Sequence, residues 1–146
     1  ATTISNHKAV SRDQFLRAIE TNLFLLQRDG VKAVLCLQPM LVLRDTALLA
    51  AEERAFLHED PNVKVLHPIV LDELKEVAQR WRVPLVDLNV TFNDPVHKGR
   101  QLLIDYCHLN GSGGEVCAQA LLPVVQVLLR PTVADSSVTA PAGSGT

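Results

Sequence analysis

Residues 31–37 read VKAVLCL, a short run that is apolar at every position except Lys32. A strand that is buried on both faces, as the strands of a parallel sheet are, has this composition. Gln38 and Pro39 follow directly, and the strand should end there because proline cannot extend a ladder of hydrogen bonds. The run therefore predicts a buried strand over residues 31–37 and favours a parallel sheet.

Segments on both sides of this run predict helices. Upstream, Ser11 and Gln14 have the spacing of a capping box, apolar residues then recur at helical intervals, and Gly30 stands where a helix C-terminus is expected. Downstream, the chain is first rich in Ala, Leu and Glu and then regains an apolar period of helical type. We expect helices over residues 12–29, 45–58 and 71–81, and a loop with a short helical turn over residues 90–104.

Residues 83–88 read VPLVDL, a second short apolar run. Helices alternate with the two runs, and this order implies parallel strands in a three-layer α/β/α sandwich. Parallel sheets usually have several strands with both faces covered, so two strands alone make a poor sheet. We therefore expect an α/β fold that is incomplete on its N-terminal side.

The last helix is expected after the glycine-rich turn at residues 110–114, because apolar residues recur at helical spacing as far as Leu128. Pro123 conflicts with this helix, since an internal proline costs about 3 kcal/mol and kinks the chain. From Pro131 onward the chain is dominated by Pro, Ser, Thr, Ala and Gly, which cannot repay the entropy of ordering. We expect one domain over residues 1–130 and a disordered tail over residues 131–146.

The composition argues against several classes of partner. A net charge of -2 provides no basic patch for nucleic acid. Apolar runs such as residues 121–129 are shorter than the roughly 20 residues that a membrane span needs. The 3 cysteines include no Cys-x-x-Cys pair, which favours neither a disulfide framework nor structural zinc. We therefore expect no metal, no organic cofactor, no nucleic acid and no membrane span.

The sharpest local feature is the segment DYCH at residues 105–108. Residues at this spacing in a turn lie on one side of the chain, so Asp105 could hold Nδ1 of His108 and leave Nε2 free as a general base. The segment follows irregular chain and precedes a helix, where catalytic loops usually lie. A pair of this kind is also common by chance, and the alternative is an ordinary surface pair where a helix begins.

The context of this pair resembles a known family. Asp105 and His108 are followed by the apolar Leu109, by the glycine-rich turn of residues 110–114 and by an Ala-rich helix. This block is similar to the last conserved block of the SGNH hydrolases (GDSL-like lipases and esterases), and the pattern of helices and strands over residues 11–129 fits the same family. The resemblance implies a flavodoxin-like fold, serine ester hydrolase activity without metal or organic cofactor, and catalytic roles for Asp105 and His108.

The chain also departs from the family pattern. The family's nucleophile lies in an N-terminal Gly-Asp-Ser motif, which does not occur here. In the family, the glycine and the asparagine of the oxyanion hole come from two further blocks that would precede Ser11. The Gly-x-Asn-Asp block has no match here, because Ser5-Asn6-His7 lacks the glycine. The resemblance therefore implies that the serine, glycine and asparagine belong to a missing N-terminal segment of the same domain. The partners that it implies are this segment and a small-molecule ester substrate.

Other residues have weaker claims to chemistry. Ser112 follows His108 closely, but a turn or helix-cap role is favoured. Cys107 is adjacent to His108, and adjacent side chains usually point apart, which argues against a thiol nucleophile. The glycines of residues 111–114 could cradle a phosphate, although no strand directly precedes them. Asp87, at the end of the second run, is a reserve carboxylate whose favoured role is helix capping. Four further histidines stand among polar neighbours and are interpreted as surface or loop residues and not as ligands: His7, His58, His67 and His97.

Two functions follow from these observations. The first is a serine-dependent ester hydrolase, to which this chain supplies the Asp–His part of a catalytic triad while being inactive alone. The second is a non-catalytic α/β interaction module that has kept the pair but lacks the nucleophile. A strand followed by Gly-Asp-Ser in the complete coding sequence would favour the enzyme, and its absence would favour the module. The class of ester and the compartment stay open.

Overall fold

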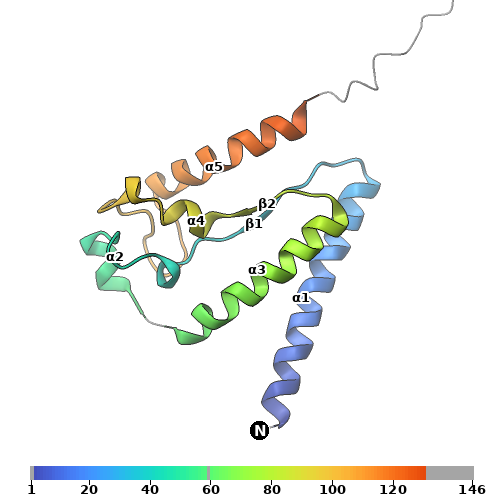
Figure 1. Ribbon diagram of the computed structural model, residues 1–146, viewed down its shortest axis with the longest axis horizontal. Helices are drawn as coiled ribbons and strands as arrows, with labels where there is room; N and C mark the ends of the chain where they lie inside the picture. Colours follow the sequence, from blue (N-terminus) through green and yellow to red (C-terminus); the bar gives the residue numbers. More distant parts are fainter. Residues whose placement is uncertain (1, 59, 131–146) are drawn as a thin grey trace, which may run out of the picture.

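The chain is mostly helical and carries a small parallel sheet (Figure 1). The computed structural model describes residues 2–58 and 60–130, so the expected tail at residues 131–146 lies outside the described residues. In chain order the elements are α1 (Thr2–Arg28), β1 (Leu35–Leu37), η1 (Leu41–Leu43), α2 (Ala51–Phe56), α3 (Pro61–Trp81), β2 (Leu85–Asp87), α4 (Leu88–Phe92), η2 (Pro95–His97) and α5 (Gly111–Leu129). The mixed α/β character that the sequence predicts is confirmed.

β1 and β2 pair in parallel, with Cys36 opposite Val86 in the centre of the ladder. The predicted parallel pairing of residues 31–37 with residues 83–88 is therefore confirmed. In the described part of the chain the sheet contains these two strands and no third. Each strand thus has one edge that no described strand covers, and such an edge presents unpaired N–H and C=O groups.

Both strands are shorter than predicted because other hydrogen bonds occupy their ends. The Val31 N–H donates to the Leu26 carbonyl at 2.8 Å, which continues the end of α1 and keeps this residue out of the sheet. Pro84 has no N–H, but its carbonyl accepts from the Leu35 N–H at 2.8 Å, so the ladder begins there. At the other end, the Asp87 side chain caps α4 and thereby turns the chain out of β2.

α1 begins at Thr2 rather than near residue 12, so the predicted capping box at Ser11 is wrong. The physical reason is that residues 2–10 contain neither glycine nor proline, and nothing in them stops a helix that extends backward. The predicted end of the helix is confirmed. Gly30 has a positive φ of 70° there, a conformation that glycine adopts at little cost.

α3 begins at Pro61, well before the predicted start at residue 71. The Asp60 side chain accepts a hydrogen bond from the Asn62 N–H at 2.9 Å, and proline is favoured at the first helical position because it has no N–H to lose. α5 matches the predicted last helix and runs through Pro123. Pro123 therefore does not end the helix.

The segment predicted to be helical over residues 45–58 contains only the short α2. Asp45 forms a turn before it, since its side chain accepts from the Ala47 N–H at 2.8 Å and its carbonyl accepts from the Leu48 N–H at 2.9 Å. The predicted loop over residues 90–104 is more helical than expected. It contains part of α4 and all of η2, which the side chains of Asp87 and Asp94 cap.

The buried apolar core lies where α4 meets the start of α5 and the segment that leads into it. Figure 1 draws α5 on one side of the two strands and α3 on the other, with α1 next to α3. Eight residues form the core: Leu41, Leu49, Leu88, Phe92, Leu102, Leu103, Val116 and Cys117. Leu102 and Leu103 come shortly before the segment at residues 105–108, and Val116 and Cys117 lie in the helix that follows it, so the core anchors the chain on both sides of this segment.

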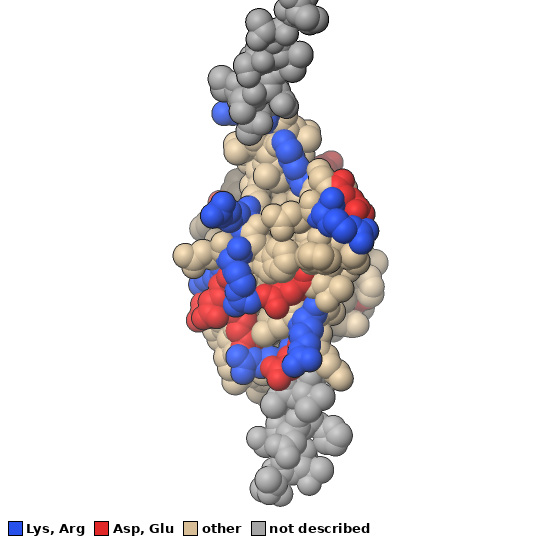
Figure 2. All heavy atoms as spheres, turned by 90° about the vertical axis from the view of Figure 1, so that its right-hand side faces the viewer, with Lys and Arg blue, Asp and Glu red and all other residues tan. Residues whose placement is uncertain are grey.

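Charged side chains of both signs are interspersed on the face that Figure 2 shows. Two ion pairs join α1 to α3: Arg12 pairs with Glu73, and Arg80 pairs with Glu20. This face therefore carries no continuous patch of one sign.

α5 is the helix in the described ranges that is long and apolar enough to cross a membrane, judged by length and composition alone. Only 11% of its most apolar window is buried, and Leu122 and Leu129 are 56% and 68% exposed. The uninterrupted apolar runs are too short for a span, but the helix meets the length once its few polar residues are included. Core helices of soluble proteins meet the same criterion but are mostly buried, whereas α5 leaves most of its apolar surface open in the described chain.

Candidate active site

The segment at residues 105–108 forms a closed loop that the backbone holds in place. Leu103 and Leu109 form an antiparallel bridge at its base, and the Ile104 N–H donates to the His108 carbonyl at 2.9 Å. Its outer side is tied to the chain that leaves β1. Gln38 Nε2 donates to the Cys107 carbonyl at 2.9 Å, and the Leu41 N–H donates to the Tyr106 carbonyl at 2.9 Å. These bonds fix the loop beside the carboxyl end of β1.

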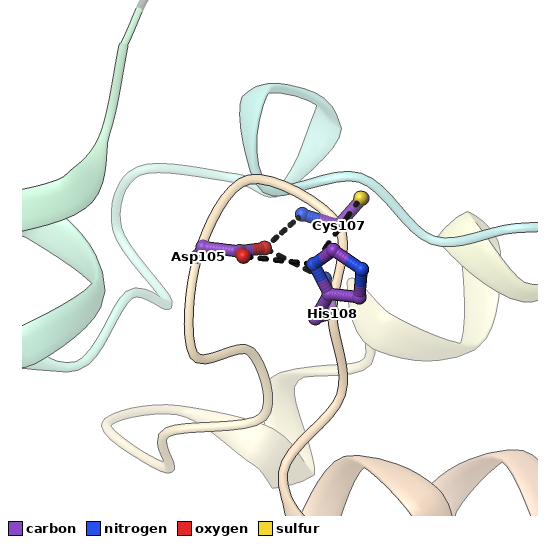
Figure 3. Close-up of side chains that lie close together, drawn as sticks. All are labelled: Asp105, Cys107 and His108. Atoms are coloured by element: carbon purple, nitrogen blue, oxygen red, sulfur yellow. Dashed lines mark hydrogen bonds and ion pairs between the residues drawn. The ribbon is translucent and has the colours of Figure 1, made fainter.

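Asp105 uses both of its carboxylate oxygens inside this loop (Figure 3). Oδ1 accepts from the backbone N–H groups of Cys107 at 2.9 Å and of His108 at 2.8 Å. Oδ2 lies 2.8 Å from Nδ1 of His108. The predicted contact between the carboxylate and Nδ1 is therefore confirmed, and we call Asp105 and His108 the dyad from here on.

These hydrogen bonds lower the pKa of Asp105 to about 2, mainly through the backbone N–H groups of Cys107 and His108 and then through the imidazole of His108. The carboxylate is consequently ionised at neutral pH and can only accept hydrogen bonds. An ionised Oδ2 beside Nδ1 requires the proton to be on Nδ1 when the imidazole is neutral. The lone pair of Nε2 is then available to accept a proton, as a general base requires.

The His108 side chain is 64% exposed, so its second nitrogen can reach solvent and a bound substrate. The ring of Tyr106 meets the imidazole edge-on, with ring centroids 6.2 Å apart. Two hollows of about 270 and 390 Å³ lie elsewhere, against α1 and the end of α3. The dyad thus stands on an open surface of the described chain and not at the bottom of either hollow.

A second polar cluster lies at the carboxyl end of β2. Asp87 caps α4 by accepting from the Asn89 N–H at 3.0 Å, so its predicted capping role is confirmed. Nε2 of His67, on α3, lies 3.5 Å from Oδ2 of Asp87 and 3.4 Å from Nδ2 of Asn89. The interpretation of His67 as a surface or loop residue is wrong, because it lies inside α3 and its side chain is only 19% exposed and faces this carboxylate.

Asn89 joins this cluster to the dyad loop. It is buried, its Oδ1 accepts from the Met40 N–H at 2.9 Å, and its Nδ2 donates to the Gln38 carbonyl at 3.0 Å. Gln38 in turn holds the Cys107 carbonyl through its side chain. Sequence reasoning missed Asn89, and the signal that could have found it is its position two residues after the strand-end Asp87, a common site of polar side chains in α/β folds.

Several other predicted roles change in the structure. His97 lies in the short η2 within the predicted loop, but it is buried and not at the surface. Asn110 rather than Ser112 caps α5. The Asn110 side chain accepts from the Gly113 N–H at 2.9 Å and its carbonyl accepts from the Gly114 N–H at 2.9 Å. These two donors at the helix N-terminus are therefore already satisfied, which argues against a phosphate cradle.

One group of side chains in the described ranges has the donor atoms and spacing that could hold a metal ion. The carboxylate of Asp105, the thiol of Cys107 and the imidazole of His108 offer ligand atoms that all lie within 4.8 Å of one another. Sγ of Cys107 is 3.9 Å from Nδ1 of His108. The sequence had suggested that these neighbouring side chains point apart, and the loop instead brings them to the same side (Figure 3).

Comparison with known proteins adds no family assignment, since no family model and no curated protein matches the chain.

Proposed function

We propose that this chain supplies the base of an SGNH-type serine ester hydrolase, with His108 as the general base and Asp105 as the residue that orients it. The observation that carries the proposal is the 2.8 Å contact between Asp105 Oδ2 and His108 Nδ1, with the opposite side of the imidazole exposed. This is the arrangement in which an aspartate holds the imidazole tautomer and leaves Nε2 free for a serine hydroxyl.

In the proposed reaction, the oxygen of a serine hydroxyl attacks the ester carbonyl while Nε2 of His108 accepts the hydroxyl proton. The ionised Asp105 stabilises the resulting imidazolium without taking up its proton. Nε2 then returns the proton to the departing alkoxide, and a water molecule repeats the sequence to release the acid. The serine is expected in the proposed N-terminal segment, because this chain contains no Gly-Asp-Ser motif. The donors that stabilise the oxyanion are expected in the same segment.

The arrangement of the elements is compatible with this proposal. A parallel pair of strands with α5 on one side and α3 on the other would form the centre of a three-layer α/β/α sandwich if further strands were added. The dyad loop is tied to the carboxyl end of β1, which is where α/β folds place their ligands. The proposed N-terminal segment would add strands to an open edge and bring its serine to this end.

Ester turnover tests the proposal. We expect the 146-residue chain to hydrolyse no aryl ester, and a longer protein that carries the upstream region to do so. In that protein, Asp105→Asn should lower kcat by about 10⁴-fold, because the amide stabilises the wrong imidazole tautomer. His108→Ala should lower kcat by several orders of magnitude, while His58→Gln, a change at an exposed histidine, should have no effect. Turnover that survives in His108→Ala would refute the proposal.

The alternative is a non-catalytic interaction module, which the absence of Gly-Asp-Ser from the chain favours. In this case the dyad loop would be a structural turn, and the longer protein would hydrolyse no ester. The two functions are separated by the upstream coding sequence and by the turnover assay on the longer protein.

A further inference from the structure

Cys107 lies in the dyad loop, yet the proposed reaction gives it no role. Its Sγ is 3.9 Å from Nδ1 of His108, and Oδ2 of Asp105 is 2.8 Å from the same nitrogen (Figure 3). The thiol sulfur and the carboxylate oxygen thus both lie near Nδ1 of the imidazole, and the three ligand atoms are within 4.8 Å of one another. Thiolate sulfur, imidazole nitrogen and carboxylate oxygen are the three kinds of protein ligand that bind zinc.

We propose that the dyad loop binds Zn²⁺ through Cys107 Sγ, His108 Nδ1 and Asp105 Oδ2, with water in the fourth position. The binding itself is independent of the proposed function, whereas its effect on ester turnover rests on that function. Three protein ligands and one water form the open type of tetrahedral zinc site.

Two of the three distances between ligand atoms lie close to those around a tetrahedral ion, and all three are below 4.8 Å. Zinc bonds of about 2.3 Å to sulfur and about 2.0 Å to nitrogen place the two donors roughly 3.6 Å apart at the tetrahedral angle. The sulfur and nitrogen lie 3.9 Å apart here. The carboxylate oxygen, now hydrogen-bonded to Nδ1 at 2.8 Å, would move outward by about half an ångström to reach the ion.

The loop is held in place before any ion binds. The carbonyl of Cys107 accepts from Gln38, and the carbonyl of Tyr106 accepts from Leu41. Backbone that is already ordered loses little further entropy on binding, so three ligands drawn from four successive residues can act together.

Binding requires two protons to move. The thiol of Cys107 releases its proton to solvent and binds as the thiolate. Nδ1 of His108 gives its lone pair to the ion, so the proton of the neutral imidazole resides on Nε2. An imidazole in this state has no lone pair for a serine proton, and zinc would therefore switch the proposed general base off.

The other two cysteines provide controls within the same chain. Burial raises the pKa of the thiols of Cys36 and Cys117, which disfavours the thiolate that zinc requires. Neither cysteine belongs to a group of potential metal ligands among the residues that the structure describes. Cys36→Ser is the better control, because Cys117 is part of the buried core.

Calorimetric titration of the purified 146-residue chain with ZnCl₂ tests the binding, with no ester present. We expect one zinc per chain in the wild type and in Cys36→Ser. Cys107→Ser and His108→Ala should each weaken binding by about 10-fold or more, since losing even an outer partner of a zinc ligand costs about 10–100-fold. With Co²⁺ in place of zinc, the thiolate-to-cobalt absorption should appear in the wild type and vanish in Cys107→Ser. Undiminished zinc affinity in Cys107→Ser would overturn the proposal, because the ion would then be bound without the assigned thiolate, for instance by histidines alone.

Turnover of the longer enzyme tests the consequence separately. Zinc should inhibit the wild type and Cys36→Ser, and the ratio of rates with and without zinc should return toward one in Cys107→Ser. If zinc inhibited Cys107→Ser as strongly as the wild type, the assignment of Cys107 as a ligand of the inhibiting zinc would be wrong. An enzyme without turnover whose chain still binds zinc through Cys107 would refute the proposed hydrolase and leave the metal site established.

Discussion

Asp105 is held more tightly by its own loop than by its partner in the dyad. Oδ1 accepts from two backbone N–H groups, and only Oδ2 contacts the imidazole of His108. The DxxH spacing therefore does two things at once. It builds a turn around the carboxylate and it delivers the histidine to the same carboxylate. A structural turn and a catalytic dyad are thus compatible uses of the same residues.

The pKa of Asp105 provides the first prediction. The backbone donors are the largest cause of its depression to about 2, so His108→Ala should raise this pKa only partly toward the ordinary value near 3.9. A carboxyl group whose pKa is lower in the folded than in the unfolded state stabilises the fold at any pH above its unfolded-state pKa. This stabilisation is lost as the pH falls from about 4, the unfolded-state pKa, through the lower pKa of the folded state. A ¹³C titration of the side-chain carboxyl in both proteins measures the effect. Complete recovery of the ordinary pKa in His108→Ala would contradict it.

Gly113 carries the second prediction, because a side chain has no room there. A Cβ at this position would lie 2.1 Å from the Leu102 carbonyl oxygen, so backbone would have to move. We expect Gly113→Ala to lower the free energy of unfolding by about 1–3 kcal/mol or more, as overpacking does. Gly114→Ala is the matched control. It meets open space in the same helix and should raise the stability by about 0.5–1 kcal/mol. Urea unfolding of both variants checks the pair.

At the residue scale, local contacts could be predicted and distant ones could not. The Asp105–His108 contact and the capping by Asp87 both follow from spacings of a few residues. The approach of His67 to Asp87 depends on how α3 packs against β2, which no spacing in the sequence encodes. The burial of His97 likewise depends on the path of η2 over the core.

α2 illustrates how an element can depend on one buried side chain. A helix of 6 residues is too short to be stable alone, since nucleation is costly. Glu53 lies in this helix and is fully buried, and its Oε1 accepts from the N–H groups of Leu102 and Leu103 at 2.9 and 3.1 Å. Its Oε2 accepts from Arg44, which is also buried. Glu53 thereby joins α2 to the segment that leads into the dyad loop.

The third prediction concerns this carboxylate. Glu53→Ala would leave Arg44 as an unpaired buried charge and would orphan three backbone donors, the N–H groups of Ala50, Leu102 and Leu103. It should therefore lower the free energy of unfolding by about 3–5 kcal/mol. Glu52→Ala, an exposed change in the same helix, should stay within about 0.5 kcal/mol of the wild type. Thermal and urea unfolding compare the two. Equal stability of the two variants would contradict the role assigned to Glu53.

At the element scale, the kinds of element were predicted better than their limits. The apolar runs identified both strands, but the lengths of β1 and β2 depend on hydrogen bonds that α1 and α4 take from their ends. The apolar period identified α3 only in its buried half. Its first part is largely exposed, although the Asp60 cap and Pro61 mark its start.

At the scale of the whole molecule, the main feature is the apolar surface that the described chain leaves open. Leu122, Val125 and Leu129 recur along one side of α5 and are 56%, 39% and 68% exposed. The strands of the sheet also have uncovered edges. Large exposed apolar surfaces of this kind normally contact another element or another molecule. In the proposed hydrolase, the N-terminal segment would cover part of this surface.

The last prediction is that the 146-residue chain self-associates through α5 when this segment is absent. Burying the side chains of Leu122 and Leu129 against a second copy should stabilise association by about 1.5–3 kcal/mol for each leucine that becomes fully buried, so the average mass should rise with concentration. The double variant Leu122→Glu/Leu129→Glu should remain monomeric because burying the two carboxylates is costly. Asn22→Glu/Gln79→Glu adds the same charge at exposed polar positions of α1 and α3 and should associate like the wild type. Light scattering after gel filtration measures the mass of each protein, and circular dichroism verifies that each is folded. A wild-type chain that stays monomeric over the whole concentration range, or a control that dissociates together with the α5 variant, would contradict the role of this helix.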